Sequence, residues 1–496
     1  MSKDNASVLL WFRRDLRLKD NAALSAAIET GKNIIALFVW SPEEEAPWEP
    51  SGASLVWLHH SLLVLEDALR KKGNSLLIKR GKTDGIILSL AEQFKIDQVF
   101  ANKIYEPDWI TRDASLEALL SERGIDFSLY PGSLLFDPSQ IKTGQGNPFQ
   151  VFTPFWKACL LRDSSPAKPL AEPELIPAPS KLSKDLSVEE LGLLPKIAWD
   201  TGIREFWRPG FLGAEEAMAE FVDDALSNYA IGRDVPSTQG TSRVSPHLHF
   251  GEITPRMIWH EVSAKMKKSP SRSRPPGSPA AEKVLSSEEI YLKEIGWREF
   301  AHHVLCNFPH SANEALRRDY NKFPWSKNEA HLHAWQKGMT GYPMVDAGMR
   351  ELWHTGWMHN RVRMIVASFL VKHLLQPWQD GARWFWDTLV DADLASNTLG
   401  WQWSAGSGAD AAPYFRIFNP VLQGEKFDPQ GIYVRKWIPE LSALPDQYIH
   451  KPWTAPPLVL QAAKVELGKT YPAPIVEHTF ARKRALEALS HLKTPT

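Results

Sequence analysis

The sequence predicts a doubly wound α/β domain that a long connector joins to a larger, all-helical domain. Three observations lead to this prediction. Apolar runs alternate with helical periodicity over residues 1–133, a segment rich in Pro, Ser and Lys follows over 134–204, and helical periodicity alone dominates 205–496. The length of 496 residues suits two or three domains.

The N-terminal domain repeats a simple unit, a short apolar run followed by an amphipathic stretch. Alternating strands and helices of this length are typical of a parallel sheet with helices on both faces. We expect Asp20 to cap the first helix, with Gly31 just past its end. No GxGxxG follows the first apolar run, so the ordinary dinucleotide fingerprint is missing. The predicted strands are 8–12, 34–40, 75–79, 98–101 and 127–130, and the predicted helices are 21–30, a long one after Ser51, 84–94 and 108–123.

The composition excludes several classes of protein. Hydrophobic residues make up 43% of the chain and charged residues 23%, which excludes a mostly disordered chain. The net charge of -1 gives the chain no overall attraction to nucleic acid, so only a local basic groove could bind it. Two cysteines cannot form a disulfide framework, and no signal peptide or membrane-spanning run is visible. We therefore expect a cytoplasmic protein that binds no membrane.

Tryptophan is unusually frequent, at 21 residues. Each indole N–H requires a partner when buried, so tryptophan is a poor choice as mere filling of a core. The excess favours stacking on planar ligands, stacking on bases, or electron transfer.

Polar clusters in the helical half have both a structural and a functional interpretation. The turn 240–245 could hold phosphate oxygens or merely cap a helix. Asp391, Asp393 and Asn397 lie within an apolar, aromatic stretch, where they could bind a ligand or form buried salt bridges, one of them with Arg363. The run 356–364 mixes aromatic, amide and guanidinium groups and is uninformative alone. Two His-x-His pairs, 247/249 and 331/333, have no evident acidic third ligand, so we predict no metal site.

Long motifs throughout the chain resemble the photolyase/cryptochrome flavoprotein family. The resemblance covers residue 8 to about residue 480. It implies an α/β domain, a connector and a helical domain that binds FAD, which agrees with the organisation predicted above. The motifs are WFRRDLRLKDN (11–21), GTSRVSPHLHFGEITPR (240–256), WREF (297–300), TGYPMVDAGMREL (340–352), GWMHNRVRM (356–364), DADLASNTLGWQW (391–403) and DAAPYFRIFNP (410–420).

The resemblance assigns an FAD pocket. It implies that residues before and within the 240–245 turn bind the phosphates and ribityl chain, that a second group surrounds the cofactor, and that Asn397 meets the redox-active ring nitrogen. The implied cofactor-binding residues are Tyr229, Thr241, Ser242, Val244, Ser245, Glu294, Arg298, Trp357, Asn360, Arg363, Asp391, Asp393 and Asn397.

Five positions separate repair enzymes from light sensors within the family. The chain looks closest to plant cryptochromes, but it departs from them at Trp297, Asn360, Met364, Asn397 and Trp403. All five match photolyases that repair cyclobutane pyrimidine dimers, so the chain resembles the class III bacterial dimer photolyases. This implies light-driven repair, in which excited reduced FAD passes an electron to a flipped-out dimer. The alternative is a blue-light photoreceptor without repair activity.

The resemblance also implies roles outside the FAD pocket. Trp297 and Trp403 would wall the dimer pocket, Glu294 would hydrogen-bond the dimer, and Met364 would form its floor. Arg361 and Arg416 would bind the DNA backbone, and Trp401, Trp378 and Trp325 would form an electron-transfer chain. Damaged DNA is thus the expected partner, and we expect a monomer.

A second, light-harvesting chromophore is usual in this family. By resemblance to class III enzymes we favour 5,10-methenyltetrahydrofolate, with Trp48 stacking on the pterin and Glu43 bonding it, while Trp109 lies nearby. A deazaflavin or no antenna remains an alternative.

Overall fold

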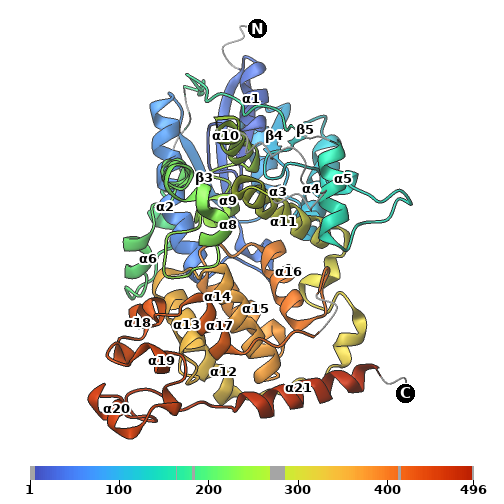
Figure 1. Ribbon diagram of the computed structural model, residues 1–496. Helices are drawn as coiled ribbons and strands as arrows, with labels where there is room; N and C mark the ends of the chain where they lie inside the picture. Colours follow the sequence, from blue (N-terminus) through green and yellow to red (C-terminus); the bar gives the residue numbers. More distant parts are fainter. Residues whose placement is uncertain are drawn as a thin grey trace, which may run out of the picture.

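The computed structural model describes residues 6–162, 165–180, 182, 185–268, 285–411 and 415–493. Figure 1 shows the strands in the upper part of the molecule and helices α12–α20 in the lower part. Five strands form one parallel sheet in the order β3-β2-β1-β4-β5. The strands are β1 (Ser7–Phe12), β2 (Asn33–Trp40), β3 (Leu76–Arg80), β4 (Gln98–Asn102) and β5 (Asp126–Tyr130).

The strand order confirms the predicted doubly wound topology. The chain moves outward from β1 to β3 and then returns to the other side of β1 for β4 and β5. Both faces are covered, because Val8, Leu10 and Phe12 of β1 belong to one core and Leu9 and Trp11 to another. The order reverses between β1 and β4, and ligands of such sheets bind beside the carboxyl ends of strands at this point. The covering helices are α1 (Ala22–Glu29), α2 (Gly52–Lys71), α3 (Thr83–Phe94) and α4 (Pro107–Ser121).

One detail of the prediction is wrong, because Asn21 and not Asp20 caps α1. The Asn21 side chain accepts a hydrogen bond from the Leu24 backbone N–H at 3.0 Å. Asp20 has a φ of 53° and a fully buried carboxylate. Its carboxylate accepts bonds from Thr254 and Arg256 of the helical half instead, so tertiary pairing outweighs the local capping preference.

The connector is more ordered than expected. It contains α5 (Phe152–Arg162) and a 3-10 turn (Glu189–Leu191), and it ends in α6 (Thr201–Phe206). Phe155 and Cys159 of α5 are buried against α11 (Ser287–Asn307), because apolar residues at helical spacing give this helix one apolar face. The boundaries at residues 133 and 204 stay predictions.

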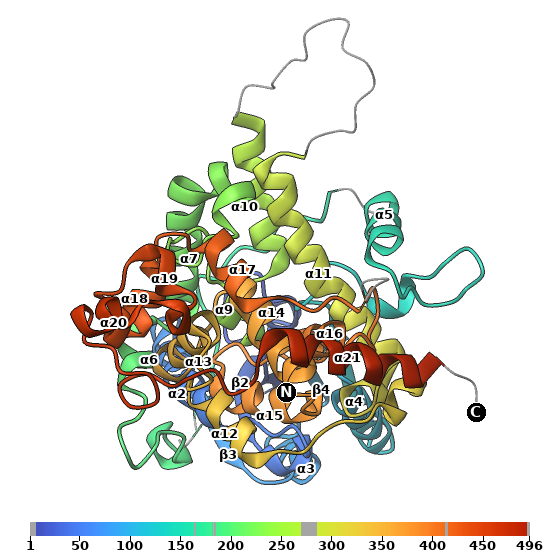
Figure 2. The ribbon, with the colours of Figure 1, turned by 60° about the horizontal axis from the view of Figure 1, so that its bottom comes forward.

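The remainder is helical, as predicted. Most of these helices pack around two cores, one centred on α13–α16 and one on α5, α10 and α11. Residues 266–280 are rich in Pro, Ser, Lys and Arg, a composition that predicts a loop between helices, but 269–284 lie outside the described residues. Figure 2 shows α21 running along the outside of this domain. The helices are α7 (Phe211–Glu220), α8 (Tyr229–Gly232), α9 (Ser245–His249), α10 (Pro255–Lys268), α12 (Glu329–Gln336), α13 (Pro343–Thr355), α14 (Asn360–Ser368), α15 (Trp378–Thr388), α16 (Leu394–Ala405), α17 (Pro420–Phe427), α18 (Ile432–Trp437), α19 (Asp446–Ile449), α20 (Pro457–Ala462) and α21 (His478–Lys493).

Candidate functional site

Three predicted cofactor-binding residues meet at the start of α9. Ser245 Oγ donates to Asp391 Oδ2 at 2.6 Å, and Arg363 Nη2 lies 2.8 and 3.0 Å from the two oxygens of that carboxylate. Arg363 also donates through Nε to the Met358 carbonyl at 2.7 Å. The predicted salt bridge between Asp391 and Arg363 is therefore present, with the carboxylate buried and the guanidinium partly exposed, and it joins segments that are distant in the sequence.

The turn before α9 is held from α11. Val244 is buried at the N-cap of α9, and the Tyr291 hydroxyl donates to Ser242 Oγ at 2.9 Å. Thr241, next to Ser242, is partly exposed. The turn thus presents hydroxyls and backbone N–H groups on a fixed frame, as a phosphate site requires.

Asp393 begins α16 and lies in a cluster of histidines. Its side chain accepts from the Ser396 N–H at 2.7 Å, with His302 Nε2 at 3.3 Å and His249 Nδ1 at 3.9 Å. Burial alone would raise the pKa of Asp393, but His302, His249 and nearby Arg298 outweigh it and hold the pKa well below 3.8. The carboxylate is therefore ionised at neutral pH.

Helix α11 aligns Glu294, Trp297 and Arg298 on one face, since they are three and four residues apart. Glu294 forms an ion pair of 2.7 Å with Arg233, whose guanidinium lies 5.4 Å from the centre of the Tyr229 ring. Arg298 donates to the Ser133 carbonyl at 2.7 Å. Glu294 stays about 29% exposed, so it can still face an incoming ligand.

The two aromatic walls expected for the dimer are both partly exposed and both supported from behind. The Trp297 ring stacks on Phe152 with a centroid distance of 3.9 Å and an interplanar angle of 9°. The Trp403 ring lies 6.5 Å from Phe418. The stack on Phe152 fixes the Trp297 ring while leaving its other side for a base, whereas Phe418 packs against Trp403 at a tilt of 31°.

The remaining predicted pocket residues come from α14, α16 and the turn before α14. Asn360 is exposed at the first position of α14, and Met364 Sδ lies 3.8 Å from Arg361 Nη1. Asn397 donates its amide to the Ala382 carbonyl at 3.0 Å, which orients the rest of its carboxamide. Trp357 is buried, with the Arg363 guanidinium 6.0 Å from its ring.

The three predicted electron-transfer tryptophans lie in or against one core. Trp401 of α16 and Trp378 of α15 are buried members of it, and Trp325 is partly buried against it. Gly381 allows the close approach of α15 to α16, because a Cβ there would lie 2.1 Å from the Trp401 ring. A further indole, Trp335, meets Trp401 at 6.1 Å.

The two predicted DNA-binding arginines differ in their surroundings. Arg361 forms an ion pair of 2.6 Å with Asp234 and lies 4.5 Å from the centre of the Phe427 ring. Arg416 is exposed, with its guanidinium 5.0 Å from the Phe418 ring. Arg416 is therefore the freer of the two to meet phosphate.

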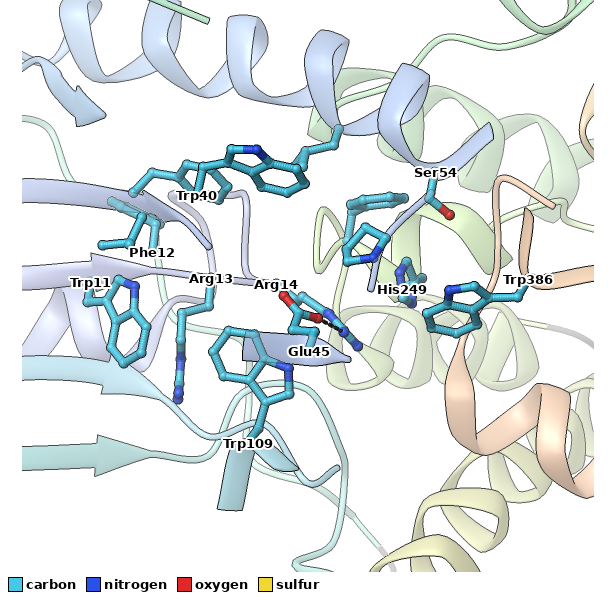
Figure 3. A pocket seen from close by; sticks show the side chains of 15 residues that line it. Trp11, Phe12, Arg13, Arg14, Trp40, Glu45, Ser54, Trp109, His249 and Trp386 are labelled. Atoms are coloured by element: carbon cyan, nitrogen blue, oxygen red, sulfur yellow. Dashed lines mark hydrogen bonds and ion pairs between the residues drawn. The ribbon is translucent and has the colours of Figure 1, made fainter. Parts of the chain in front are cut away.

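A separate pocket lies at the carboxyl ends of β1 and β2, at the switch point of the sheet. Its lining is mainly aromatic and basic, with Trp11, Arg13, Arg14, Trp40 and Trp109 among its side chains. Figure 3 shows Trp40 on one side, Trp109 on the opposite side, the Arg14–Glu45 ion pair between them and Trp386 at one end. His249 and Phe250 bring the helical half into the lining.

The residues expected to hold the antenna do not line this pocket. Glu43 is exposed, whereas Glu45 two residues later contacts Arg14 at 2.7 Å. Trp48 is buried against Trp386 and donates its indole N–H to Asn313 at 3.1 Å. With three residues per 3-10 turn, Glu43 and Glu45 point in different directions, and Glu45 is the one that faces the pocket, which the local sequence does not indicate. Trp109 does line the pocket.

The floor of the pocket is strongly charged but internally neutralised. Burial disfavours the charge of Arg14, yet Glu106 and Glu45 outweigh this effect and raise its pKa. Arg13 pairs with Asp113 at 2.6 Å and lies 4.7 Å from the Trp11 ring. Arg112 lies 3.8 Å over the Trp109 ring. Fixed cations beside flat indoles suit a planar ligand with anionic or carbonyl groups.

Buried donors around the α9–α14–α16 site indicate a ligand of their own. Arg243 Nε, His359 Nε2 and Trp401 Nε1 meet no hydrogen-bond acceptor among the described residues. Buried donors without an acceptor are rare in the interior of a folded protein. His359 accepts from the Arg361 N–H through Nδ1, and burial lowers its pKa to about 4, so its Nε2 carries the proton at neutral pH. These donors, the hydroxyl-rich turn and the Asp391–Arg363 pair fit a cofactor with phosphate, ribityl and ring acceptors, as FAD has.

Sequence reasoning missed several residues of the site. Arg233, Arg243 and His302 were not singled out, although Arg243 lies inside the 240–245 turn. His302 is five residues beyond Trp297, and only the packing of α11 against α16 brings it to Asp393. His247 of the first His-x-His pair contacts Glu252. In the part of the chain that the structure describes, no three His, Cys, Asp or Glu side chains form a group that could hold a metal.

Comparison with known proteins agrees with this architecture. Residues 8–174 match the DNA photolyase family model, and residues 291–491 match the model of the FAD binding domain of DNA photolyase. A deoxyribodipyrimidine photo-lyase of Agrobacterium fabrum is 45% identical over the full length of both chains. Cryptochrome-1 of Arabidopsis thaliana is 41% identical over 98% of this chain and 70% of that protein. A bacterial class III photolyase from Agrobacterium tumefaciens has a crystal structure that superposes with a TM-score of 0.93, at 44% identity and 99% coverage of both chains.

The fold and the site thus define a flavoprotein with an α/β domain and a helical FAD-binding domain. The chain belongs to the photolyase/cryptochrome family. Among the described residues, no helix has the length and apolarity that crossing a membrane would require.

Proposed function

We propose that the protein is a deoxyribodipyrimidine photo-lyase that repairs cyclobutane pyrimidine dimers in DNA with blue light. The observation that supports this best is the full-length match to a photo-lyase together with the repair-type residues Trp297, Asn360, Met364, Asn397 and Trp403. Reduced FAD, when bound, supplies the electron that opens the dimer. We further propose that the dimer is flipped out of the duplex and that the protein acts as a monomer.

The chain's own residues bind and orient the two reactants. Ser245, Arg363 and Asp391 fix the cofactor cradle, while the Asn397 carboxamide adds no negative charge beside the ring. Trp297 and Trp403 receive the dimer, at about 1–3 kcal/mol of stacking per base. Glu294 hydrogen-bonds the dimer, while its ion pair with Arg233 holds the carboxylate in position.

We propose that the switch-point pocket holds the antenna chromophore. Trp40 and Trp109 on opposite sides suit the planar pterin of 5,10-methenyltetrahydrofolate, and Glu45 replaces Glu43 as the nearby carboxylate. A deazaflavin, the alternative antenna, would lie between the same two tryptophans. The test is to extract and identify the chromophores bound to the purified wild type and to a Trp109→Ala variant. The variant should lose the antenna and keep FAD.

Repair of a thymine-dimer oligonucleotide by reduced protein, in blue light and in the dark, tests the main proposal. Light-dependent restoration of thymines supports it, and Trp297→Ala and Glu294→Gln should lower the repair yield with flavin still bound. Trp353→Ala is a matched control, because this tryptophan is 54% exposed and lies outside the proposed pocket. Full flavin reduction without any repair would overturn the proposal.

A blue-light photoreceptor is the second candidate, because identity to the Arabidopsis cryptochrome-1 reaches 41%. The same experiment separates the two, since a photoreceptor should change its flavin redox state in light without restoring thymines.

A further inference from the structure

A buried lysine lies directly beneath the segment that bears Arg416. Lys372 belongs to a π-helical turn, Phe369–His373, between α14 and α15, and is 4% exposed. Its Nζ donates to the backbone carbonyl of Arg416 at 2.5 Å and lies 4.6 Å from the centre of the Phe415 ring. A buried ammonium group thus contacts the backbone carbonyl of Arg416 and the ring of Phe415, two neighbours in the same segment.

A second side chain of the same helical run holds the next part of that segment. Ser368, one turn before Lys372, accepts a hydrogen bond from the Phe418 N–H at 3.3 Å. Phe418 in turn contacts the Arg416 guanidinium and the Trp403 ring. Ser368 and Lys372 therefore fix residues 415–418 at two points, with Arg416 facing solvent next to Trp403.

No carboxylate of the described residues forms an ion pair with Lys372. Within the described residues no carboxylate lies within 4.0 Å of its Nζ, and α16 contains no ionisable side chain. His478 and Arg484 of α21 contact His373 instead. On α15, Asp380 accepts from Gln376.

The same isolation makes the ammonium sensitive to its neighbours. Burial, followed by repulsion from Arg416, lowers the pKa of Lys372 to about 7. The two arginines at the start of α14 have acids of their own, since Arg361 pairs with Asp234 and Arg363 with Asp391. Arg416 is therefore the unpaired charge near Lys372, and its neutralisation would remove the repulsion that lowers the pKa of Lys372.

We propose that Lys372 is a positioning residue for DNA, which holds the Arg416 segment in place and takes up a proton from solvent when a DNA phosphate binds Arg416. The proposal rests on the proposed contact between Arg416 and DNA. A phosphate at Arg416 removes the repulsion that Lys372 feels, so the bound complex favours the charged ammonium. The ammonium then strengthens its bond to the Arg416 carbonyl and its contact with Phe415.

The direction of the pH effect follows from this linkage. Below pH 7 Lys372 is charged both with and without DNA, and affinity is greatest. As the pH rises above 7, the free protein loses the proton before the complex does, so affinity falls until the complex is deprotonated as well.

The test is binding of a dimer-containing oligonucleotide to the FAD-loaded protein in the dark, by fluorescence anisotropy, at constant ionic strength from pH 6.5 to 8.5. We expect wild-type affinity to fall about threefold or more over this range. Lys372→Arg should bind with little pH dependence, because a guanidinium stays charged. Lys372→Met should bind weakly at all pH values. Calorimetry in two buffers of different ionisation enthalpy should show proton uptake by the wild type and less by both variants.

Two further variants keep the result interpretable. Lys426→Met removes an exposed cation and should retain the wild-type pH slope. Ser368→Ala should weaken binding yet retain that slope, because it loosens the segment without removing the titrating group. The inference is overturned if Lys372→Arg retains the wild-type slope, or if the wild type takes up no proton. Failure of the wild type to prefer dimer-containing over undamaged DNA would instead contradict the proposed function.

Discussion

At the scale of single residues, one part of the site consists of polar groups that pair with one another in the absence of a ligand. Asp391 is the clearest case, since it accepts from Ser245 and pairs with Arg363 while it is almost fully buried. A buried pair of this kind adds little to stability by itself, but the loss of one partner leaves the other charge unpaired. The arrangement therefore fixes Arg363 and the α9 turn in the orientation in which they can bind a cofactor.

Asp391→Asn should reduce the FAD content of the purified protein. The amide cannot neutralise Arg363, so we expect a loss of at least about 1.5 kcal/mol in cofactor binding, or roughly tenfold in affinity. Absorbance at the flavin band relative to protein absorbance measures this. Asp387→Asn on α15 is a control, because this carboxylate is exposed and, among the described residues, forms no hydrogen bond with the α9 turn. Equal flavin loss in both variants would contradict the role of Asp391.

Glu351 should make stability fall with rising pH. Burial raises its pKa to about 7 despite the hydrogen bond of 2.5 Å from the Tyr433 hydroxyl, whereas its usual value is 4.5. The folded protein thus keeps a proton that the unfolded chain loses between these values, so stability from this group declines as the pH rises from 4.5 to 7.

Glu351→Gln removes this loss because the amide does not titrate. Thermal unfolding at pH 5 and pH 8 should show the wild type losing more stability than the variant, by about 1–3 kcal/mol. Parallel pH profiles of the two proteins would contradict this assignment.

At the scale of elements, α15 and α16 meet so closely that the contact depends on one glycine. A Cβ at Gly381 would lie 2.1 Å from the ring of Trp401, the tryptophan expected beside the flavin. Gly400, on α16 itself, has no atom within 4 Å of such a Cβ. Helix packing therefore decides the position of Trp401, the predicted electron-transfer residue, and the two glycines provide a matched pair.

Gly381→Ala should destabilise the protein by about 1–3 kcal/mol through overpacking and should slow photoreduction of the oxidised flavin. Gly400→Ala should be neutral or stabilising by up to about 1 kcal/mol and leave photoreduction unchanged. Denaturant unfolding and the absorbance change under blue light measure both effects. If Gly381→Ala photoreduces at the wild-type rate, the close approach of α15 does not govern Trp401.

At the scale of the whole molecule, the α/β domain is joined to the helical half by buried polar contacts. Asp20 accepts from Thr254 Oγ1 at 2.6 Å and pairs with Arg256, and the Trp57 indole donates to Glu252 at 2.9 Å. The Leu16 N–H donates to the Phe250 carbonyl at 3.1 Å. These contacts all reach residues just beyond α9, so the sheet and the cofactor cradle hold one geometry relative to each other.

Asp20→Asn should lower the free energy of unfolding by about 3–5 kcal/mol, because Arg256 then lacks its counter-ion. Asparagine tolerates the φ of 53° at this position, so the change tests the charge and not the backbone. Lys19→Gln, which breaks only an exposed pair with Glu215, should cost less than about 1 kcal/mol. Urea unfolding compares the two, and similar losses would contradict a special role for Asp20.

The sequence by itself determined the sheet, the order of its helices and the family. Each strand is a run of apolar residues, and the motifs around Trp297, Asn360 and Asp391 are long enough to be recognised without a structure. These features are local, because a strand, a helix or a motif depends on residues that are neighbours in the chain.

Only the tertiary structure decided which distant groups meet. It paired Glu294 with Arg233 and Asp393 with His302, left Asn21 to cap α1 while Asp20 reached the helical half, and lined the switch-point pocket with Glu45 and not Glu43. It also placed Lys372 beneath Arg416. Such contacts join residues far apart in the chain and depend on how whole elements pack, and a periodicity read along one segment holds no information about the segment that will lie against it.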